Sequence, residues 1–353
     1  MTSVGTERVR FLLIGAGNVG RRFLGLVDGQ GARLRQKLGL DLVPVGVADS
    51  SGVVTNPEGL PLAEIMEYKA GGRGVAEHPL WGVRGRSALE MVRTQDADLL
   101  LEASPANLKD GQPALGCIEA ALSSGMNVVT ANKAPLVLAF SRLIELAQAN
   151  GVRLCYDATV AGGLPAVNLG QRDLAAAKIE RLEGVLNLTT NYILTRMAED
   201  GLSYEEALSD AQVAGHAETD PTLDVEGWDA ANKLVILANS VLGYPAGLDD
   251  VDVTGILGVS DDMLKAAVER GMRVKLVAMA EADGDGYRLD VRPRELVAGH
   301  PLAQLGPKQM GIVYHTDVSG SISAAIVEET PVPTAFAMLR DVVEIYAGAR
   351  RPQ

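Results

Sequence analysis

A glycine-rich turn directly follows the first apolar run of the chain, and this order constrains the fold more than any other feature. Residues 9–14 (VRFLLI) lead into GAGNVG at 15–20, and an apolar-periodic segment continues to Val27. Strand, glycine turn and helix in this order are typical of a dinucleotide-binding fold, because the glycines permit a tight turn and the close approach of a pyrophosphate. The helix N-terminus supplies unpaired N–H groups to phosphates. A glycine-rich turn without a ligand is the alternative.

The nucleotide-binding interpretation selects specific residues. A second apolar run, 42–48, ends at Asp49, where this fold places the acid that hydrogen-bonds the adenosine ribose. An acid disfavours a 2′-phosphate and favours NAD, although Arg21, Arg22 and Ser50 could accommodate NADP. Residues 30–39 lengthen the connection before this run, as an extension of the crossover helix or as a loop. In the turn, the expected cofactor-binding residues are Gly15, Gly17, Asn18, Val19 and Gly20.

The following segments predict a parallel, doubly wound sheet. Strands are expected at 97–103 and 127–129 with a helix at 116–124 between them, whereas 52–85 is irregular apart from a helix at 62–68. Ligands of such sheets lie beyond the carboxyl ends of the strands, so Ala103, Ser104 and Lys133 are expected beside the cofactor. Lys133 would face the nicotinamide; a solvated lysine at a helix start is the alternative.

Length, composition and charge exclude several classes of protein. The 353 residues suffice for two domains, and the net charge of -13 opposes binding to nucleic acids or anionic membranes. Two isolated cysteines indicate reduced thiols rather than a disulfide framework or a metal site. No basic leader or apolar stretch of about 20 residues is visible. We therefore expect a cytoplasmic protein.

The second half of the chain predicts an α+β domain. Strands are expected at 151–159 and 182–188, helices at 192–199, 204–213 and 228–242, and β-hairpins at 273–293 and 312–327. Ser203 and Glu206 form a capping-box pattern. We expect the hairpin strands to join in an antiparallel sheet that mediates a homodimer. The expected domains are 1–133, completed by a returning helix within 330–353, and 134–329 for substrate binding, catalysis and dimerisation.

An acidic stretch at 211–233 (AQVAGHAETDPTLDVEGWDAANK) ends in a single lysine. Carboxylates beside a lone lysine can hold a substrate ammonium and tune the proton affinity of the lysine, which suggests an amino-acid substrate and a proton transfer. The alternative is structural: Asp229 and Lys233 are spaced i,i+4, and a surface ion pair of this kind contributes roughly 0.2–0.5 kcal/mol.

Four separated motifs together resemble the homoserine dehydrogenases. They are GAGNVG at 15–20, TANK at 130–133, DATVAGGLP at 157–165 and the acidic stretch at 211–233. Within the last motif, the residues that follow the family pattern are Ala211, Gly215, Asp220, Pro221, Asp224, Gly227, Asp229 and Lys233. The resemblance covers the whole chain and implies the short form of the enzyme, without an ACT domain and without threonine inhibition through one.

The resemblance implies a reaction and a role for each matching residue. The reaction converts L-homoserine and NAD(P)+ to L-aspartate 4-semialdehyde and NAD(P)H, reversibly, in threonine and methionine biosynthesis. Lys233 would exchange the proton with the substrate hydroxyl, Lys133 would place cofactor and substrate, and Asp229 would orient the site. Glu218 and Asp224 would bind homoserine. A monovalent cation such as Na+ or K+ would bind at Asp157, Val160, Gly162 and Leu164.

The chain departs from the family pattern at three places. His216 stands where the family prefers an aromatic or aliphatic residue, and we interpret it as packing behind the site. Asp157 replaces the commoner glutamate, which weakens the expected cation binding. Residues 329–334 replace a glycine-rich stretch that contacts the cofactor in many relatives. The alternatives are an oxidoreductase of the same fold acting on another small hydroxy or amino acid, and a non-catalytic dinucleotide-binding sensor.

Overall fold

The computed structural model describes residues 6–347 of the chain. The chain divides into two compact units, which we describe separately. The first unit comprises Met1–Gly163 with Thr330–Gln353, and the second comprises Leu164–Glu329. No helix within 6–347 is long and apolar enough to cross a membrane.

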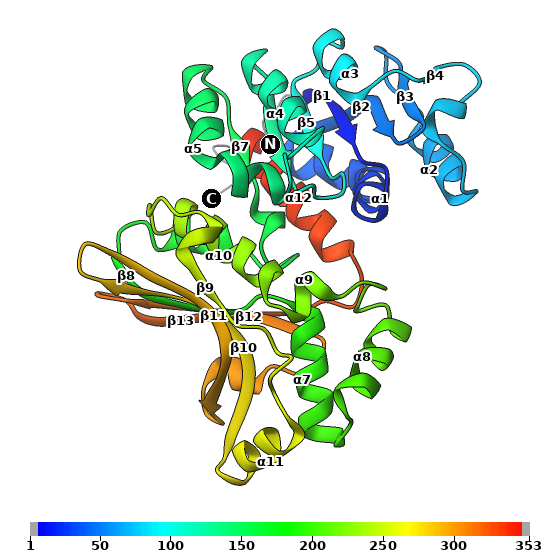
Figure 1. Ribbon diagram of the computed structural model, residues 1–353. Helices are drawn as coiled ribbons and strands as arrows, with labels where there is room; N and C mark the ends of the chain where they lie inside the picture. Colours follow the sequence, from blue (N-terminus) through cyan, green and yellow to red (C-terminus); the bar gives the residue numbers. More distant parts are fainter. Residues whose placement is uncertain (1–5, 348–353) are drawn as a thin grey trace. The chain divides into compact units, whose positions relative to one another are not determined.

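The first unit contains a seven-stranded sheet in the order β4-β3-β2-β1-β5-β6-β7 (Figure 1). Strands β2, β1, β5, β6 and β7 are parallel, while β3 and β4 extend the sheet in antiparallel fashion. The sheet confirms the expected doubly wound fold. The expectation that 52–85 is irregular apart from one helix was wrong at its two ends, which form the edge strands β3 and β4. The strands are β1 (Glu7–Ile14), β2 (Leu40–Asp49), β3 (Gly52–Thr55), β4 (Gly82–Arg84), β5 (Leu99–Glu102), β6 (Asn127–Thr130) and β7 (Leu154–Cys155).

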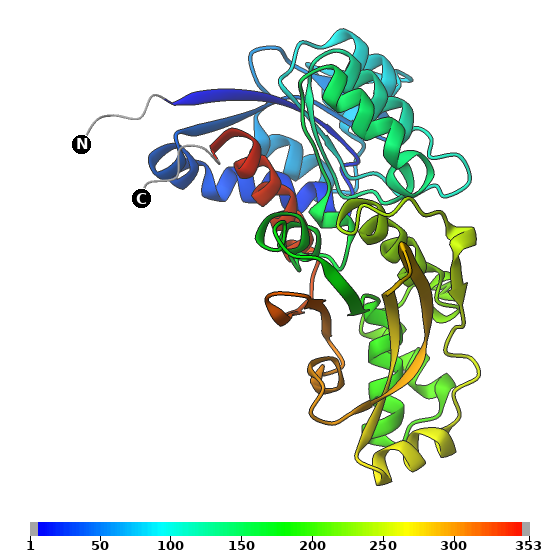
Figure 2. The ribbon, with the colours of Figure 1, turned by 90° about the vertical axis from the view of Figure 1, so that its left-hand side faces the viewer.

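Helices of this unit bury their apolar faces against the sheet. Phe11 and Phe23, for example, meet edge to face with ring centroids 5.9 Å apart. The C-terminal helix α12 lies beside α1 in both views (Figures 1 and 2), which places the end of the described chain in the first unit. The helices are α1 (Asn18–Arg33), α2 (Leu62–Ala70), α3 (Ala88–Thr94), α4 (Ala114–Ser123), α5 (Ala134–Ala149) and α12 (Val332–Ala347).

The expected strand at 151–159 is mostly absent. Only Leu154–Cys155 pair with β6, and a 3-10 turn follows at Asp157–Thr159. The backbone N–H of Asp157 donates to the Asp341 carboxylate of α12 (3.0 Å), so a side chain replaces the ladder partner that a longer strand would require. With α5 and β7, this segment extends the first unit beyond residue 133, to Gly163.

The second unit contains a six-stranded sheet in the order β13-β12-β8-β10-β11-β9. Both expected hairpins are confirmed: β10 pairs with β11 and β12 pairs with β13, antiparallel in each case. The sheet is not purely antiparallel, because β9 pairs with β11 in parallel. The strands are β8 (Ile179–Val185), β9 (Val251–Val253), β10 (Met272–Asp283), β11 (Gly286–Val297), β12 (Gln309–Thr316) and β13 (Gly320–Val327).

Helices α7 and α10 pack against this sheet. The expected strand at 182–188 ends at Val185, because Asn187 caps α7 by accepting a hydrogen bond from the Thr190 N–H (2.9 Å). The capping box of Ser203 and Glu206 is confirmed at the start of α8. The helices are α6 (Ala166–Asn168), α7 (Leu188–Asp200), α8 (Tyr204–Val213), α9 (Thr222–Val225), α10 (Trp228–Ser240) and α11 (Asp261–Glu269).

Candidate active site

The glycine turn of the first unit lies against the carboxyl ends of β1 and β5. Gly15 has φ +90°, and a Cβ there would lie 2.5 Å from backbone atoms of Ala103 and Ser104. A Cβ at Gly20 would lie 2.0 Å from the Gly15 carbonyl oxygen. Both positions therefore require glycine, because the backbone of the turn, the start of α1 and the end of β5 approach one another closely.

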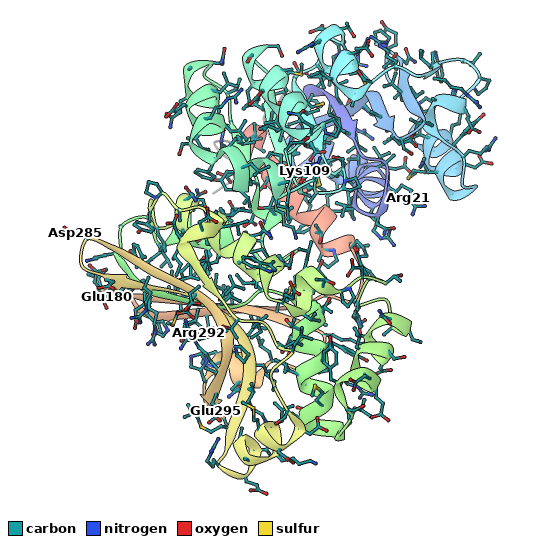
Figure 3. All side chains as sticks on the ribbon, viewed as in Figure 1. Arg21, Lys109, Glu180, Asp285, Arg292 and Glu295 are labelled. Carbon is teal, nitrogen blue, oxygen red and sulfur yellow. The ribbon has the colours of Figure 1, made fainter. Side chains whose placement is uncertain are left out.

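The first turn of α1 has room for a phosphate. Apart from Gly17 and its two chain neighbours, no atom of residues 6–347 lies within 4 Å of the position that a Cβ on Gly17 would take. Gly17 is also the N-cap of α1, and no side chain caps the helix there. The initial N–H groups of an uncapped helix attract anions, so this geometry fits the diphosphate of a dinucleotide. Arg21 lies in the same turn (Figure 3), and its Nε donates to the Gly17 carbonyl (3.3 Å).

Asp49 ends β2, as expected, but protein groups surround its carboxylate. Oδ1 accepts from the Ser51 N–H (2.9 Å) and hydroxyl (2.5 Å), and Oδ2 accepts from Lys69 Nζ (2.6 Å) and the Val75 N–H (3.1 Å). Burial raises the pKa of Asp49, but the hydrogen bonds from Lys69, Ser51 and Val75 outweigh it, so the pKa lies below its ordinary value. A carboxylate has about four lone-pair positions, and all four have partners here.

A buried glutamate that sequence reasoning missed organises the ends of β5 and β6. Glu102 is fully buried, and its Oε1 accepts from the Ser104 N–H (2.9 Å) and from the Ser104 hydroxyl. Burial raises the pKa of Glu102 to about 7, against the lowering effect of hydrogen bonds from Ser104, Asn132 and Thr130. Lys133 lies after the end of β6, at the N-cap of α5, and is half-buried. The expected residues Ala103, Ser104 and Lys133 thus stand at the carboxyl edge of the sheet.

In the second unit, Lys233 and Asp229 form an almost buried ion pair within α10. Lys233 Nζ lies 2.7 Å from Asp229 Oδ2, with side-chain exposures of 13% and 9%. The same Nζ donates to the carbonyl of Leu186 (2.6 Å), the residue that follows β8. The i,i+4 spacing therefore does not produce a solvent-exposed surface pair.

Asn187 joins the two carboxylates of this cluster. Its Nδ2 donates to Asp224 Oδ1 (2.6 Å) and to Asp229 Oδ2 (2.8 Å). The Thr189 hydroxyl lies 2.9 Å from Asp224 Oδ2 and 2.8 Å from the His216 carbonyl oxygen. Burial, followed by the charge of Asp229, raises the pKa of Asp224. Asn187 and Thr189 were not among the expected site residues, although a polar Asn-x-Thr directly after an apolar strand was a usable signal.

Glu218 and His216 lie in the segment between α8 and α9. Glu218 is exposed, and its carboxylate makes no hydrogen bond or ion pair with any residue in the range 6–347. The His216 ring packs on Tyr192, with centroids 5.0 Å apart. Burial, followed by the charge of Lys308, lowers the pKa of His216. The structure therefore brings Asp224, Asp229 and Lys233 together, but it does not connect Glu218 to them.

The Asp157 loop of the first unit, residues 157–163, includes three of the positions at which a cation was expected. Asp157 is 1% exposed, and its carboxylate accepts a hydrogen bond from Arg340 of α12. Val160 is buried and Gly162 is half-buried, while Leu164 begins the second unit and is also buried. No group of three or more His, Cys, Asp or Glu side chains that could hold a metal ion occurs in the described part of the chain.

These features define a class of protein. A parallel sheet with an uncapped glycine turn is suited to binding a dinucleotide, and a lysine held among carboxylates is suited to proton transfer. Together they are characteristic of a dinucleotide-dependent oxidoreductase.

Comparisons with known proteins specify the family. The family model for homoserine dehydrogenase matches residues 165–343, and that for the homoserine dehydrogenase NAD-binding domain matches 15–157. Homoserine dehydrogenase of Methanocaldococcus jannaschii is 38% identical over 87% of this chain and 90% of its own length. The NAD(+)-dependent homoserine dehydrogenase of Pseudomonas canavaninivorans is 35% identical over 98% of both. A hyperthermophilic archaeal homoserine dehydrogenase, solved in complex with NADPH, superposes with a TM-score of 0.83 at 26% identity, covering 98% of this chain and 99% of that one.

The chain belongs to the homoserine dehydrogenase family. It is an oxidoreductase that interconverts L-homoserine and L-aspartate 4-semialdehyde with NAD(P). The resemblance described from the four motifs is therefore confirmed, and a non-catalytic sensor is not favoured.

Proposed function

We propose that Lys233 transfers the proton in the interconversion of L-homoserine and L-aspartate 4-semialdehyde. The supporting observation is the geometry of its ammonium group. An ammonium has three N–H donors. Two are directed at the Leu186 carbonyl and the Asp229 carboxylate, and no other residue in 6–347 accepts the third. The third N–H is thus available to a substrate oxygen, while the other two fix the direction in which it points.

The carboxylates of the cluster provide a site for the substrate ammonium. With Lys233 protonated and Asp224 and Asp229 ionised, the cluster carries one net negative charge. A bound ammonium neutralises that charge, and it also offsets the mutual repulsion that contributes to the raised pKa of Asp224. We assign substrate binding to Asp224 and Glu218, with Asp229 orienting Lys233 through their ion pair.

The first unit would bind the dinucleotide, and the second would bind the substrate. Gly15, Gly17, Asn18, Val19 and Gly20 would hold the diphosphate at the uncapped start of α1. Ala103, Ser104 and Lys133 would place the nicotinamide at the carboxyl edge of the sheet. The bound cofactor supplies the hydride chemistry.

The residues of the chain account for the proton balance. In homoserine oxidation the hydroxyl proton passes to neutral Lys233 Nζ as the C–H hydrogen leaves as hydride. In aldehyde reduction the ammonium returns that proton to the oxygen that receives negative charge. A general acid–base group of this kind contributes about 10²–10⁴-fold to the rate.

For the cofactor, we propose NAD over NADP. An acid at the end of β2 disfavours a 2′-phosphate. Lys69 neutralises much of the Asp49 charge at 2.6 Å, so the discrimination against NADP should be modest. Among the relatives, the Pseudomonas protein is named as NAD(+)-dependent, while the archaeal structure contains NADPH.

We further propose a homodimer formed through the sheet of the second unit. Its edge strand β13 alternates exposed and half-buried side chains, and Val327 on it is 56% exposed. An edge strand presents N–H and C=O groups that a second copy of the chain can pair with. Sedimentation analysis should give twice the chain mass. We also expect the enzyme to act in the cytoplasm, because both cysteines are free thiols.

A substrate panel tests the proposed function. Purified enzyme should oxidise L-homoserine with NAD or NADP, followed by the absorbance of the reduced cofactor. Homoserine should be oxidised faster than L-serine, L-threonine and small 2-hydroxy acids. Faster turnover of another hydroxy amino acid would favour the alternative of a related oxidoreductase with a different substrate.

A further inference from the structure

The Asp157 loop has a constrained backbone. Ala161 has φ +52°, and it is the one residue other than glycine with positive φ in the described range 6–347. Gly162 follows with φ +59°. A left-handed conformation is unfavourable for alanine, so two such residues in succession persist only when surrounding contacts hold the loop in place.

Helix α12 provides those contacts through two consecutive residues. The Arg340 guanidinium donates to the Asp157 carboxylate at one end of the loop. It also donates to the Gly163 carbonyl at the other end, with Nη1 and Nη2 at 3.3 and 3.4 Å. The next residue, Asp341, accepts the Asp157 backbone N–H (3.0 Å). A single cationic group therefore bridges a carboxylate and a backbone carbonyl of the same loop.

These two oxygens are of the types that a hard metal cation binds. Such cations take carboxylate and backbone carbonyl oxygens as ligands. Asp157 is buried, and a buried carboxylate requires a compensating positive charge. The guanidinium meets this requirement with a charge that is permanent, because arginine does not lose its proton in proteins.

A guanidinium and a metal ion at the same oxygens would repel each other. The expected site at Asp157, Val160, Gly162 and Leu164 therefore does not fit a monovalent cation while Arg340 holds the Asp157 carboxylate. We propose that the Arg340 guanidinium takes the place of a monovalent cation in the Asp157 loop, so that this enzyme binds neither Na+ nor K+ there.

Salt substitution in the wild-type enzyme tests this proposal directly. The melting temperature is measured in NaCl, KCl and choline chloride at equal ionic strength, together with the sodium NMR linewidth on titration with enzyme. We expect the same melting temperature in all three salts. We also expect that the enzyme does not broaden the sodium signal in a way that added K+ reverses. A melting temperature raised specifically by Na+ or K+, or broadening reversed by K+, would overturn the proposal.

Variants that lack the Arg340 guanidinium test whether a cation binds once the guanidinium is removed. Arg340→Met leaves the Asp157 carboxylate without the guanidinium. The melting temperature of this variant should therefore be several degrees higher in NaCl or KCl than in choline chloride. Arg340→Met combined with Asp157→Asn removes both charges and should lose this response. Arg142→Met, an exposed arginine of the same unit, is the matched control. If the Arg340→Met protein had the same melting temperature in all three salts, this would contradict the proposal that the guanidinium takes the place of a cation. If this variant does not fold, the wild-type measurement decides.

Discussion

The Lys233 ammonium lies 2.7 Å from the Asp229 carboxylate, and both side chains are almost shielded from solvent. A buried pair of this kind is fixed in direction, because each partner would be costly to bury alone. The Leu186 carbonyl adds a second restraint at 2.6 Å. The lysine is therefore positioned before any substrate arrives.

Replacement of Lys233 by alanine should reduce turnover by roughly two to four orders of magnitude, because the proton-transfer group is lost. Steady-state rates with homoserine measure the effect. Lys265→Ala, an exposed lysine in the same unit, is the matched control and should retain normal turnover. Near-normal turnover in the Lys233 variant would contradict the assignment.

Stability can be separated from catalysis with a double variant. Lys233→Ala leaves Asp229 buried without its ion partner, which costs about 3–5 kcal/mol in typical cases. Asp229→Asn with Lys233→Met removes both charges, so its melting temperature should recover toward the wild-type value while turnover stays low. Recovery of turnover together with stability would mean that Lys233 has only a structural role.

Asn187 offers a second test, because its amide links Asp224 to Asp229. Asn187→Asp replaces the amide donor with a third carboxylate, whereas Asn187→Ser replaces the amide with a shorter hydroxyl and adds no charge. Both replacements retain an N-cap for α7. We expect kcat/KM for homoserine to fall in both variants, and to fall about tenfold further in Asn187→Asp. Equal losses would show that the added charge does not act on the site.

Much of the fold followed from local sequence patterns. The glycine turn, the capping box at Ser203 and the two hairpins depend on residues close together in the chain, and the structure contains all of them. Of the strand expected at 151–159 only Leu154–Cys155 forms, and the Asp157 N–H donates instead to Asp341 of α12, far along the sequence. Apolar periodicity carries no information about such a partner.

The site was predictable only where residues lie in one motif. Asp224, Asp229 and Lys233 share the acidic stretch, so their common location could be proposed from spacing. Asn187 comes from a separate segment that tertiary packing places beside them. The partners of Asp49 were equally invisible, because Lys69 approaches it from α2. Local patterns thus identified reactive side chains but not the groups that orient or neutralise them.

Lys69 should influence the choice of cofactor. Its ammonium lies 2.6 Å from Asp49 Oδ2, and it reduces the repulsion that Asp49 would exert on a 2′-phosphate. Lys69→Met should therefore raise the ratio of kcat/KM with NAD to kcat/KM with NADP by roughly tenfold, which corresponds to about 1.4 kcal/mol. Lys37→Met, an exposed lysine of the same unit, serves as control. An unchanged ratio would place the 2′-position away from this pair.

Glu102 should make stability depend on pH. Burial raises its pKa to about 7 from an ordinary value of 4.5, so the folded protein retains a proton that the unfolded chain has already released. Between pH 4.5 and pH 7 the free energy of unfolding falls as pH rises. Above pH 7 the carboxylate is ionised in the folded protein, whose stability is then lowered by the full cost of burying that charge. Glu102→Gln carries no such charge. Its melting temperature relative to wild type should therefore rise by several degrees between about pH 5 and pH 8.

The measurement is a pair of melting curves at each pH for wild type and Glu102→Gln. Taking the difference between the two proteins cancels contributions from other titrating groups, including Lys275, whose pKa burial lowers to about 8. Glu145→Gln removes an exposed carboxylate from the same unit. The difference between its melting temperature and that of wild type should stay constant across this pH range. The difference in melting temperature between Glu102→Gln and wild type could also stay constant with pH. In that case the hydrogen bonds from Ser104, Thr130 and Asn132 would offset the cost of burying the ionised carboxylate, and Glu102 would stay charged beside the proposed nicotinamide position.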